Sequence, residues 1–131
     1  MDLTNRKVLI ADDDQDILEQ LHIMLSRAGM EVIQAQGGKE AEELLADFQP
    51  DIAVIDLMME HMDSGFVLCH HIKKRYPGTP VIILTAVTAD TGLELHAVTA
   101  EERAWVRADA VMDKPVLSEQ LLNQIKLLLN G

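Results

Sequence analysis

The sequence predicts a three-layer α/β fold built around a doubly wound, five-stranded parallel sheet. Short apolar runs alternate along the chain with segments of helical periodicity, five times in all. The first of these runs is continuous, as in a strand that is buried on both faces. Parallel strands need crossover helices, and right-handed crossovers put those helices on both faces of the sheet. We therefore expect the strand order 2-1-3-4-5, one of the common orders for such sheets.

Each predicted strand is an apolar run that ends at, or just before, a polar residue. The runs are residues 7–11, 31–35, 51–56, 81–84 and, as the weakest, 110–112. The first helix follows the first strand directly. Asp16 has the character of its N-cap, with Glu19 three residues on as the capping partner, and Gly29 is expected to end it.

Apolar side chains at three- and four-residue intervals mark the later helices. The second should stop near Pro50, and the third should end before Pro77. A fourth helix is expected within residues 91–107, and Ser118 should cap the last one. The periodic positions are Ala41, Leu44, Leu45 and Phe48; Phe66, Cys69, Ile72 and Tyr76; and Leu121, Leu122, Ile125, Leu128 and Leu129. Without a linker or repeat, residues 1–131 are expected to form one domain with flavodoxin-like topology.

Composition limits the possible partners and setting. The net charge of −11 disfavours direct nucleic-acid binding, because phosphate contacts need clustered Lys and Arg. Cys69 is the only cysteine, so an internal disulfide is impossible and a reducing cytoplasm is the expected location. No apolar run approaches membrane-spanning length and no signal peptide is evident, so we expect no membrane association.

Polar side chains gather where the predicted strands end. They are Asp12, Asp13, Asp56, Thr85 and Lys114. Because the carboxyl ends of parallel strands meet at one edge of the sheet, these side chains should share one cleft. Carboxylates so close repel one another unless a cation joins them, which predicts a divalent metal site.

Each of these residues also has an ordinary interpretation. The aspartates could be favourable charge at a helix N-terminus, Thr85 a β-branched strand residue, and Lys114 a surface lysine before a proline. The acidic run is not an EF-hand calcium loop, because Ile17 stands where that loop needs glycine. The combined pattern favours the shared cleft.

Four motifs give this chain a family resemblance. The runs VLIADDD, DIAVIDLMM, VIILTA and MDKP resemble those of the receiver domain of two-component response regulators, as in chemotaxis regulators. The motifs occur in the family's order over essentially the whole chain.

The resemblance implies a role for each cleft residue. Asp56 would be the phospho-acceptor, Asp13 a direct ligand of Mg²⁺ and Asp12 a ligand acting through water, with the backbone carbonyl of Met58 completing the protein's share. Lys114 and Thr85 would contact phosphoryl oxygens. The domain would then be a phospho-acceptor that assists its own phosphorylation and dephosphorylation, and not an enzyme in the ordinary sense.

The chain departs from the family pattern in the loop after Asp56. Glu60 stands where the family typically has proline, and Ser64 precedes Gly65 as an apparent insertion. Two expectations for the Glu60 side chain are open: it adds a carboxylate that tunes the metal site, or it points to water.

Other departures concern the signal after phosphorylation. Val111 replaces an aromatic residue that usually swings inward in this family. Arg107 replaces a helix-ending glycine, the segment between Thr85 and Lys114 is long, and Trp105 could anchor a partner or fill the core. In the family, the positions of Met58 and Val87 border the path of the hydrolytic water. Apolar side chains cannot orient that water by hydrogen bonds, so the resemblance implies slow dephosphorylation.

Two classes of function follow. The first is a phosphorylation switch that serves a sensor histidine kinase or a phosphotransfer protein and controls a partner or an output domain. The kinase would dock near residues 14–28, and a homodimer would use the fourth helix, fifth strand and fifth helix. The alternative is a phosphorylation-independent protein-interaction module. A metal-dependent phosphatase is disfavoured because Met58 stands where its second acid would be.

Overall fold

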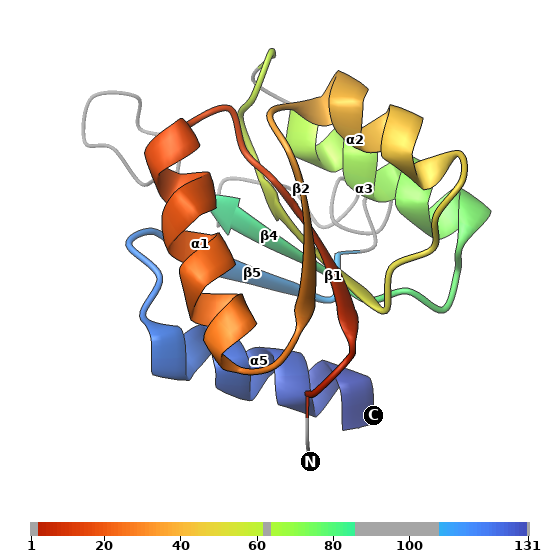
Figure 1. Ribbon diagram of the computed structural model, residues 1–131. Coiled ribbons are helices and arrows are strands. Elements are labelled where there is room, and N and C mark those ends of the chain that lie inside the picture. Colours follow the sequence, from red (N-terminus) through yellow and green to blue (C-terminus); the bar gives the residue numbers. More distant parts are fainter. Residues whose placement is uncertain (1–2, 62–63, 86–107, 131) are drawn as a thin grey trace.

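The computed structural model describes residues 3–61, 64–85 and 108–130, and it contains the expected five-stranded parallel sheet in the order β2-β1-β3-β4-β5 (Figure 1). The elements in chain order are β1 (Lys7–Ala11), α1 (Gln15–Arg27), β2 (Glu31–Ala35), α2 (Gly38–Leu45), β3 (Ile52–Asp56), α3 (Ser64–Arg75), β4 (Val81–Thr85), β5 (Ala110–Asp113) and α5 (Ser118–Asn130). The fourth predicted helix, residues 91–107, lies outside the described residues, together with Trp105 and Arg107.

Helices cover the sheet on both faces, as predicted. In Figure 1, α1 and α5 lie on one side of the sheet, and α2 and α3 lie on the other. Alternate residues of one strand serve the two layers: Val8 and Ile10 pack with α1 and α5, whereas Leu9 and Ala11 pack with α2 and α3. Such double burial explains why the three central strands, β1, β3 and β4, are mainly aliphatic.

The N-cap of the first helix lies two residues earlier than predicted. Asp14, not Asp16, is the N-cap: its backbone is extended, and its side chain accepts a hydrogen bond of 2.9 Å from the N–H of Asp16. The prediction of Asp16 was wrong because either aspartate has the right chemistry, and only the short turn after β1 decides which one caps. Gly29 follows the helix with φ of 90°, the left-handed conformation expected after a helix end.

The second helix is shorter than predicted, because it ends at Leu45 and leaves Phe48 beyond it. Side chains at the end of α3 hold the C-terminal turn of α2. The Tyr76 hydroxyl donates to the carbonyl of Leu45 at 2.7 Å, and the Arg75 guanidinium donates to the carbonyl of Ala46 at 2.9 Å. These bonds satisfy carbonyls that a helix end leaves unpaired, so α2 is fixed to α3 at this end.

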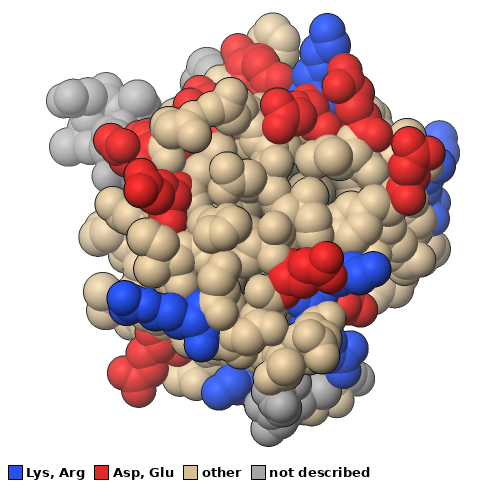
Figure 2. Space-filling model, viewed as in Figure 1, with Lys and Arg blue, Asp and Glu red and all other residues tan. Residues whose placement is uncertain are grey.

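The surface agrees with the acidic composition. Figure 2 shows Asp and Glu side chains gathered toward the top of the face in view, and Lys and Arg side chains dispersed mainly along its lower and right-hand parts. None of the helices in the described part of the chain is both long enough and apolar enough to span a membrane.

Candidate functional site at the carboxyl edge of the sheet

The polar residues predicted from strand ends lie at the carboxyl edge of the sheet. Asp12 follows β1, Asp56 and Thr85 end β3 and β4, and Lys114 follows β5. Strand pairing continues into this edge, because the N–H of Lys114 donates to the carbonyl of Thr85 at 2.8 Å. The neighbouring N–H of Leu57 donates to the carbonyl of Leu84 at 2.8 Å. The parallel register therefore brings together residues that lie up to 102 positions apart.

Lys114 connects two of the aspartates. Its Nζ donates to Asp12 Oδ2 at 2.9 Å and to Asp56 Oδ1 at 2.8 Å. Both carboxylates are almost fully buried, with Asp12 1% exposed and Asp56 6% exposed. The second oxygen of Asp12 accepts a hydrogen bond of 2.9 Å from the N–H of Asp14, which fixes the orientation of that carboxylate. The cleft therefore contains a buried network of charged groups. Removing one partner would leave an uncompensated buried charge, which destabilises the folded state.

Burial of the cluster perturbs the protonation of its carboxylates. Burial raises the pKa of Asp56 to about 6; the hydrogen bond from Lys114 opposes this rise, and the charge of Asp12 adds to it. Burial also raises the pKa of Asp12, against the hydrogen bonds from Asp14 and Lys114. Burial alone would lower the pKa of Lys114, but its hydrogen bonds to Asp56 and Asp12 outweigh that effect and raise it. Perturbed titration of this kind is typical of functional clefts.

Three carboxylates offer ligand atoms for a cation. One oxygen from each of Asp12, Asp13 and Asp56 lies within 4.8 Å of the others, and Asp13 is the exposed member of the set. Hard carboxylate oxygens in this number fit Mg²⁺, which takes few protein ligands and keeps several waters. Their chemistry does not suit metals that prefer thiolate or imidazole.

Thr85 and Met58, the remaining predicted site residues, differ from each other in their surroundings. Thr85 is buried at the end of β4, opposite Asp113 of β5. Met58 is partly buried, and its side chain packs with the α2 and α3 layer. Val87, the other residue expected to border the hydrolytic water, lies outside the described residues.

Gly65 lets helix α3 approach the end of strand β3 closely. A Cβ atom at this position would lie 2.4 Å from the carbonyl oxygen of Asp56 and 2.6 Å from Cα of Leu57. The N–H of Gly65 donates to the carbonyl of Leu57 at 2.7 Å, so the backbones touch directly. The family pattern indicated a glycine near this position but not the reason for it. The reason is this close backbone contact, which leaves no room for a side chain.

Glu60 has a position that the sequence did not reveal. Its carboxylate accepts hydrogen bonds from the N–H groups of Gly38, at 2.8 Å, and Lys39, at 3.0 Å. These bonds hold the pKa of Glu60 below its usual range. Glu60 is exposed, as the second expectation has it, but its carboxylate also caps helix α2 across 22 positions of sequence. The adjacent glycines of residues 37–38 were the only signal, and they are equally typical of an ordinary turn.

A domain with this sheet order and a buried Asp–Lys cluster at its carboxyl edge has the architecture of a signalling receiver. The family model of the response regulator receiver domain matches residues 8–126. The chain therefore belongs to the response regulator receiver domain family.

Curated and solved relatives agree with this family. The chain is 35% identical over 135 residues to the transcriptional regulatory protein GltR of Pseudomonas aeruginosa, covering 98% of this chain and 51% of that protein. It thus spans about half the length of this curated relative. A putative response regulator from Chloroflexus aurantiacus has a TM-score of 0.82 at 27% identity, with 98% of this chain and 100% of that chain covered. The chemotaxis response regulator CheY4 of Vibrio cholerae has a TM-score of 0.79 at 27% identity, with 95% and 99% covered.

Proposed function

We propose that the domain is a Mg²⁺-dependent phosphorylation switch in which Asp56 accepts a phosphoryl group from a histidine kinase or a phosphotransfer protein. The observation that carries this proposal is the bridge from Lys114 to both Asp12 and Asp56, beside the third carboxylate of Asp13. A receiver whose cleft had lapsed would have no reason to keep these buried charges, because unpaired or crowded charge is costly. Signalling that depends on phosphorylation is the coarse function that the family gives.

The chemistry is a phosphoryl transfer to a carboxylate. An ionised oxygen of Asp56 attacks phosphorus, the bond from phosphorus to the donor nitrogen breaks, and an acyl phosphate forms. A pKa of about 6 leaves the Asp56 carboxylate mostly ionised at neutral pH, so it can act as a nucleophile. Lys114 then transfers its hydrogen bond from Asp56 to a phosphoryl oxygen, and the Thr85 hydroxyl donates to another.

The metal would be held by Asp13 directly, by Asp12 through water, by Asp56, and by the backbone carbonyl of Met58. When bound, Mg²⁺ supplies positive charge against the oxygens of the transferring phosphoryl group. The residues of the chain do the rest: the Asp14 N–H orients Asp12, and Lys114 restrains Asp12 and Asp56 before the donor arrives.

Intact-mass measurement tests this function. The protein is incubated with Mg²⁺ and acetyl phosphate, and we expect the mass to rise by one phosphoryl group. Asp56→Asn, and the wild type with a chelator in place of Mg²⁺, should show no added mass. An unmodified wild-type protein would instead support the phosphorylation-independent interaction module.

We expect the phosphorylated state to be long-lived. Met58 and Val87 lie two residues beyond Asp56 and Thr85, and apolar side chains there cannot hold an attacking water by hydrogen bonds. The combined change of Met58 to Asn and Val87 to Glu should shorten the lifetime by about tenfold or more, in the range of general-base effects. The measurement is loss of phosphoryl mass after the donor is removed. Rapid phosphate release in the wild type, unaltered by the double substitution, would contradict the expectation.

The signal is expected to leave the cleft by the segment after Thr85. Val111 is 36% exposed on β5 and cannot exchange buried and exposed positions as an aromatic ring does. Phosphorylation should therefore change the amide chemical shifts of residues 89–106. Unchanged shifts across that segment in the phosphorylated protein would rule out this route.

Partner surfaces are part of the same proposal. A kinase would dock over α1 and the nearby loops, and a second copy or an output domain over the fourth helix, β5 and α5. Large apolar side chains are exposed on these elements: Leu117 before α5 is 59% exposed, Leu127 on α5 is 67% exposed, and Val111 lies on β5. Exposed apolar residues of this size are compatible with an interaction surface.

A further inference from the structure

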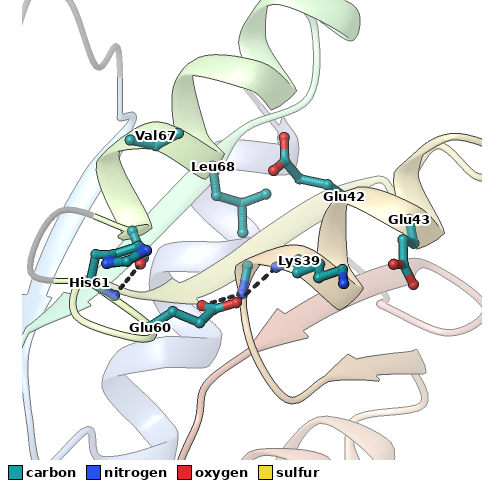
Figure 3. Close-up of a pocket in the computed structure, with 9 residues that line it drawn as sticks. Lys39, Glu42, Glu43, Glu60, His61, Val67 and Leu68 are labelled. Carbon is teal, nitrogen blue, oxygen red and sulfur yellow. Dashed lines mark hydrogen bonds between the residues drawn. The ribbon is translucent and has the colours of Figure 1, made fainter.

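The loop that follows the acceptor strand is anchored to helix α2 by one side chain. Figure 3 shows the Glu60 carboxylate turned toward the N-terminal end of α2, with dashed lines to the backbone of that helix. It forms part of the wall of a groove of about 600 Å³, which His61 and Leu68 also line. The carboxylate lies against Gly37, where a Cβ atom would be 2.9 Å from Oε2. Glycine at this position therefore makes the room that the anchor occupies.

The anchor point is itself fixed. Tyr76 and Arg75 bind carbonyls at the C-terminal end of α2, and Glu60 binds N–H groups at its N-terminal end. Helix α2 is thus held at both ends by the chain segment that contains α3 and its preceding loop. A side chain bonded to such a helix can restrain the loop from which it extends.

The restrained loop includes a proposed metal ligand. Glu60 lies two residues after Met58 and four after Asp56. At its start, directly after β3, the loop is fixed by the hydrogen bond from the N–H of Gly65 to the carbonyl of Leu57. Further along the loop, the N–H of Met59 donates to the carbonyl of His61 at 3.2 Å, and the N–H of His61 donates to the Ser64 hydroxyl at 2.8 Å. Glu60 joins this loop to α2 by hydrogen bonds, beside the apolar packing of Met59 in the same layer.

We propose that Glu60 is a positioning residue that sets the backbone of Met58 for Mg²⁺ binding and so strengthens the affinity of the cleft for the metal. This inference rests on the proposed function, since it assumes that the cleft binds Mg²⁺. Glu60 acts through the backbone that it restrains, because its carboxylate is occupied by the two N–H groups of α2. Removing a group that orients a metal ligand commonly weakens metal affinity by about tenfold or more.

The test compares Mg²⁺ affinity in unphosphorylated variants by calorimetric titration. Glu60→Ala should raise the Kd for Mg²⁺ about tenfold, in the range found for groups that orient metal ligands. Glu60→Gln keeps one acceptor oxygen and should restore part of the affinity. Glu43→Ala is the matched control, because it removes an equal charge from the same groove and should leave the Kd within about twofold.

A second variant reaches the anchor from the opposite side. Gly37 has an extended backbone with φ of 166°, which alanine adopts freely, so Gly37→Ala disturbs only the space that Glu60 occupies. It should weaken Mg²⁺ binding in the wild type but have no further effect in the Glu60→Ala background. Such loss of additivity identifies coupling between the two positions. Hydrogen exchange at the Gly38 and Lys39 amides should speed up in both single variants.

The outcomes separate this inference from the proposed function. At saturating Mg²⁺, the rate of phosphorylation by acetyl phosphate should return to within about twofold of wild type, because only metal binding is weakened. If Glu60→Ala exposes the two amides yet binds Mg²⁺ as Glu43→Ala does, Glu60 is merely a helix cap and the inference is wrong. If the wild type does not bind Mg²⁺ at all, both the inference and the proposed function fail.

Discussion

Replacing Asp56 with asparagine is expected to abolish phosphorylation and, without Mg²⁺, to raise the free energy of unfolding by about 2 kcal/mol near neutral pH. A folded-state pKa of about 6 means that the native cleft disfavours the ionised carboxylate relative to the unfolded chain. Asparagine keeps the size and removes the charge. Lys114 still has a partner, because it remains bonded to Asp12.

The pH dependence gives the sign of this effect. Because folding raises the Asp56 pKa, protonation favours the native state: this contribution is complete below the unfolded pKa near 4 and is lost as pH rises through about 6. The advantage of Asp56→Asn should therefore be largest above pH 6 and shrink as the pH falls toward 4. Urea unfolding in the presence of a chelator measures it. Glu19→Gln, on the exposed side of α1, is the control for loss of one charge. Equal stability of wild type and Asp56→Asn at all pH values would contradict the prediction.

The same charge that destabilises the apo domain makes it useful. Three carboxylates with oxygens within 4.8 Å of one another reduce stability unless a cation binds them, which is a common conflict between stability and function. Added Mg²⁺ should stabilise the wild type more than Asp56→Asn, because the substitution removes one ligand.

Replacing Gly65 with alanine is expected to cost about 3 kcal/mol of stability. The new Cβ atom would lie 2.4 Å from the carbonyl oxygen of Asp56 and 2.6 Å from Cα of Leu57, so backbone must move. In an unobstructed helix the same change would raise stability by up to about 1 kcal/mol. A loss of stability would therefore show that the close contact with β3 outweighs the helix propensity of alanine. Because the displaced atoms belong to the acceptor strand, phosphorylation should slow as well.

Gly78→Ala provides a matched control for this substitution. No atom lies within 4 Å of a Cβ added at Gly78, so alanine there should change stability by less than about 0.5 kcal/mol. Urea unfolding of the two variants, together with intact-mass kinetics, makes the comparison. Equal stability of the Gly65→Ala and Gly78→Ala proteins would show that α3 can withdraw from β3 without penalty.

Most of the fold was predictable because strand burial is local information. Val8, Ile10, Val54 and Ile82 belong to runs whose interior positions are all apolar, and such runs are typical of a sheet covered on both faces. Ends of elements were less predictable. Asp14 and Asp16 differ little in chemistry, and Phe48 continues the apolar spacing of α2 although the helix has already ended.

The strand ends read from the sequence predicted that Asp12, Asp13, Asp56, Thr85 and Lys114 lie at one edge of the sheet, because parallel strands end at one edge. Packing in three dimensions sets the hydrogen bonds among them, with Lys114 shared by Asp12 and Asp56. It also decided what Glu60 does and why residue 65 is glycine. Both depend on contacts between segments that approach one another only after the layers pack, and such distances have no local signature in the chain.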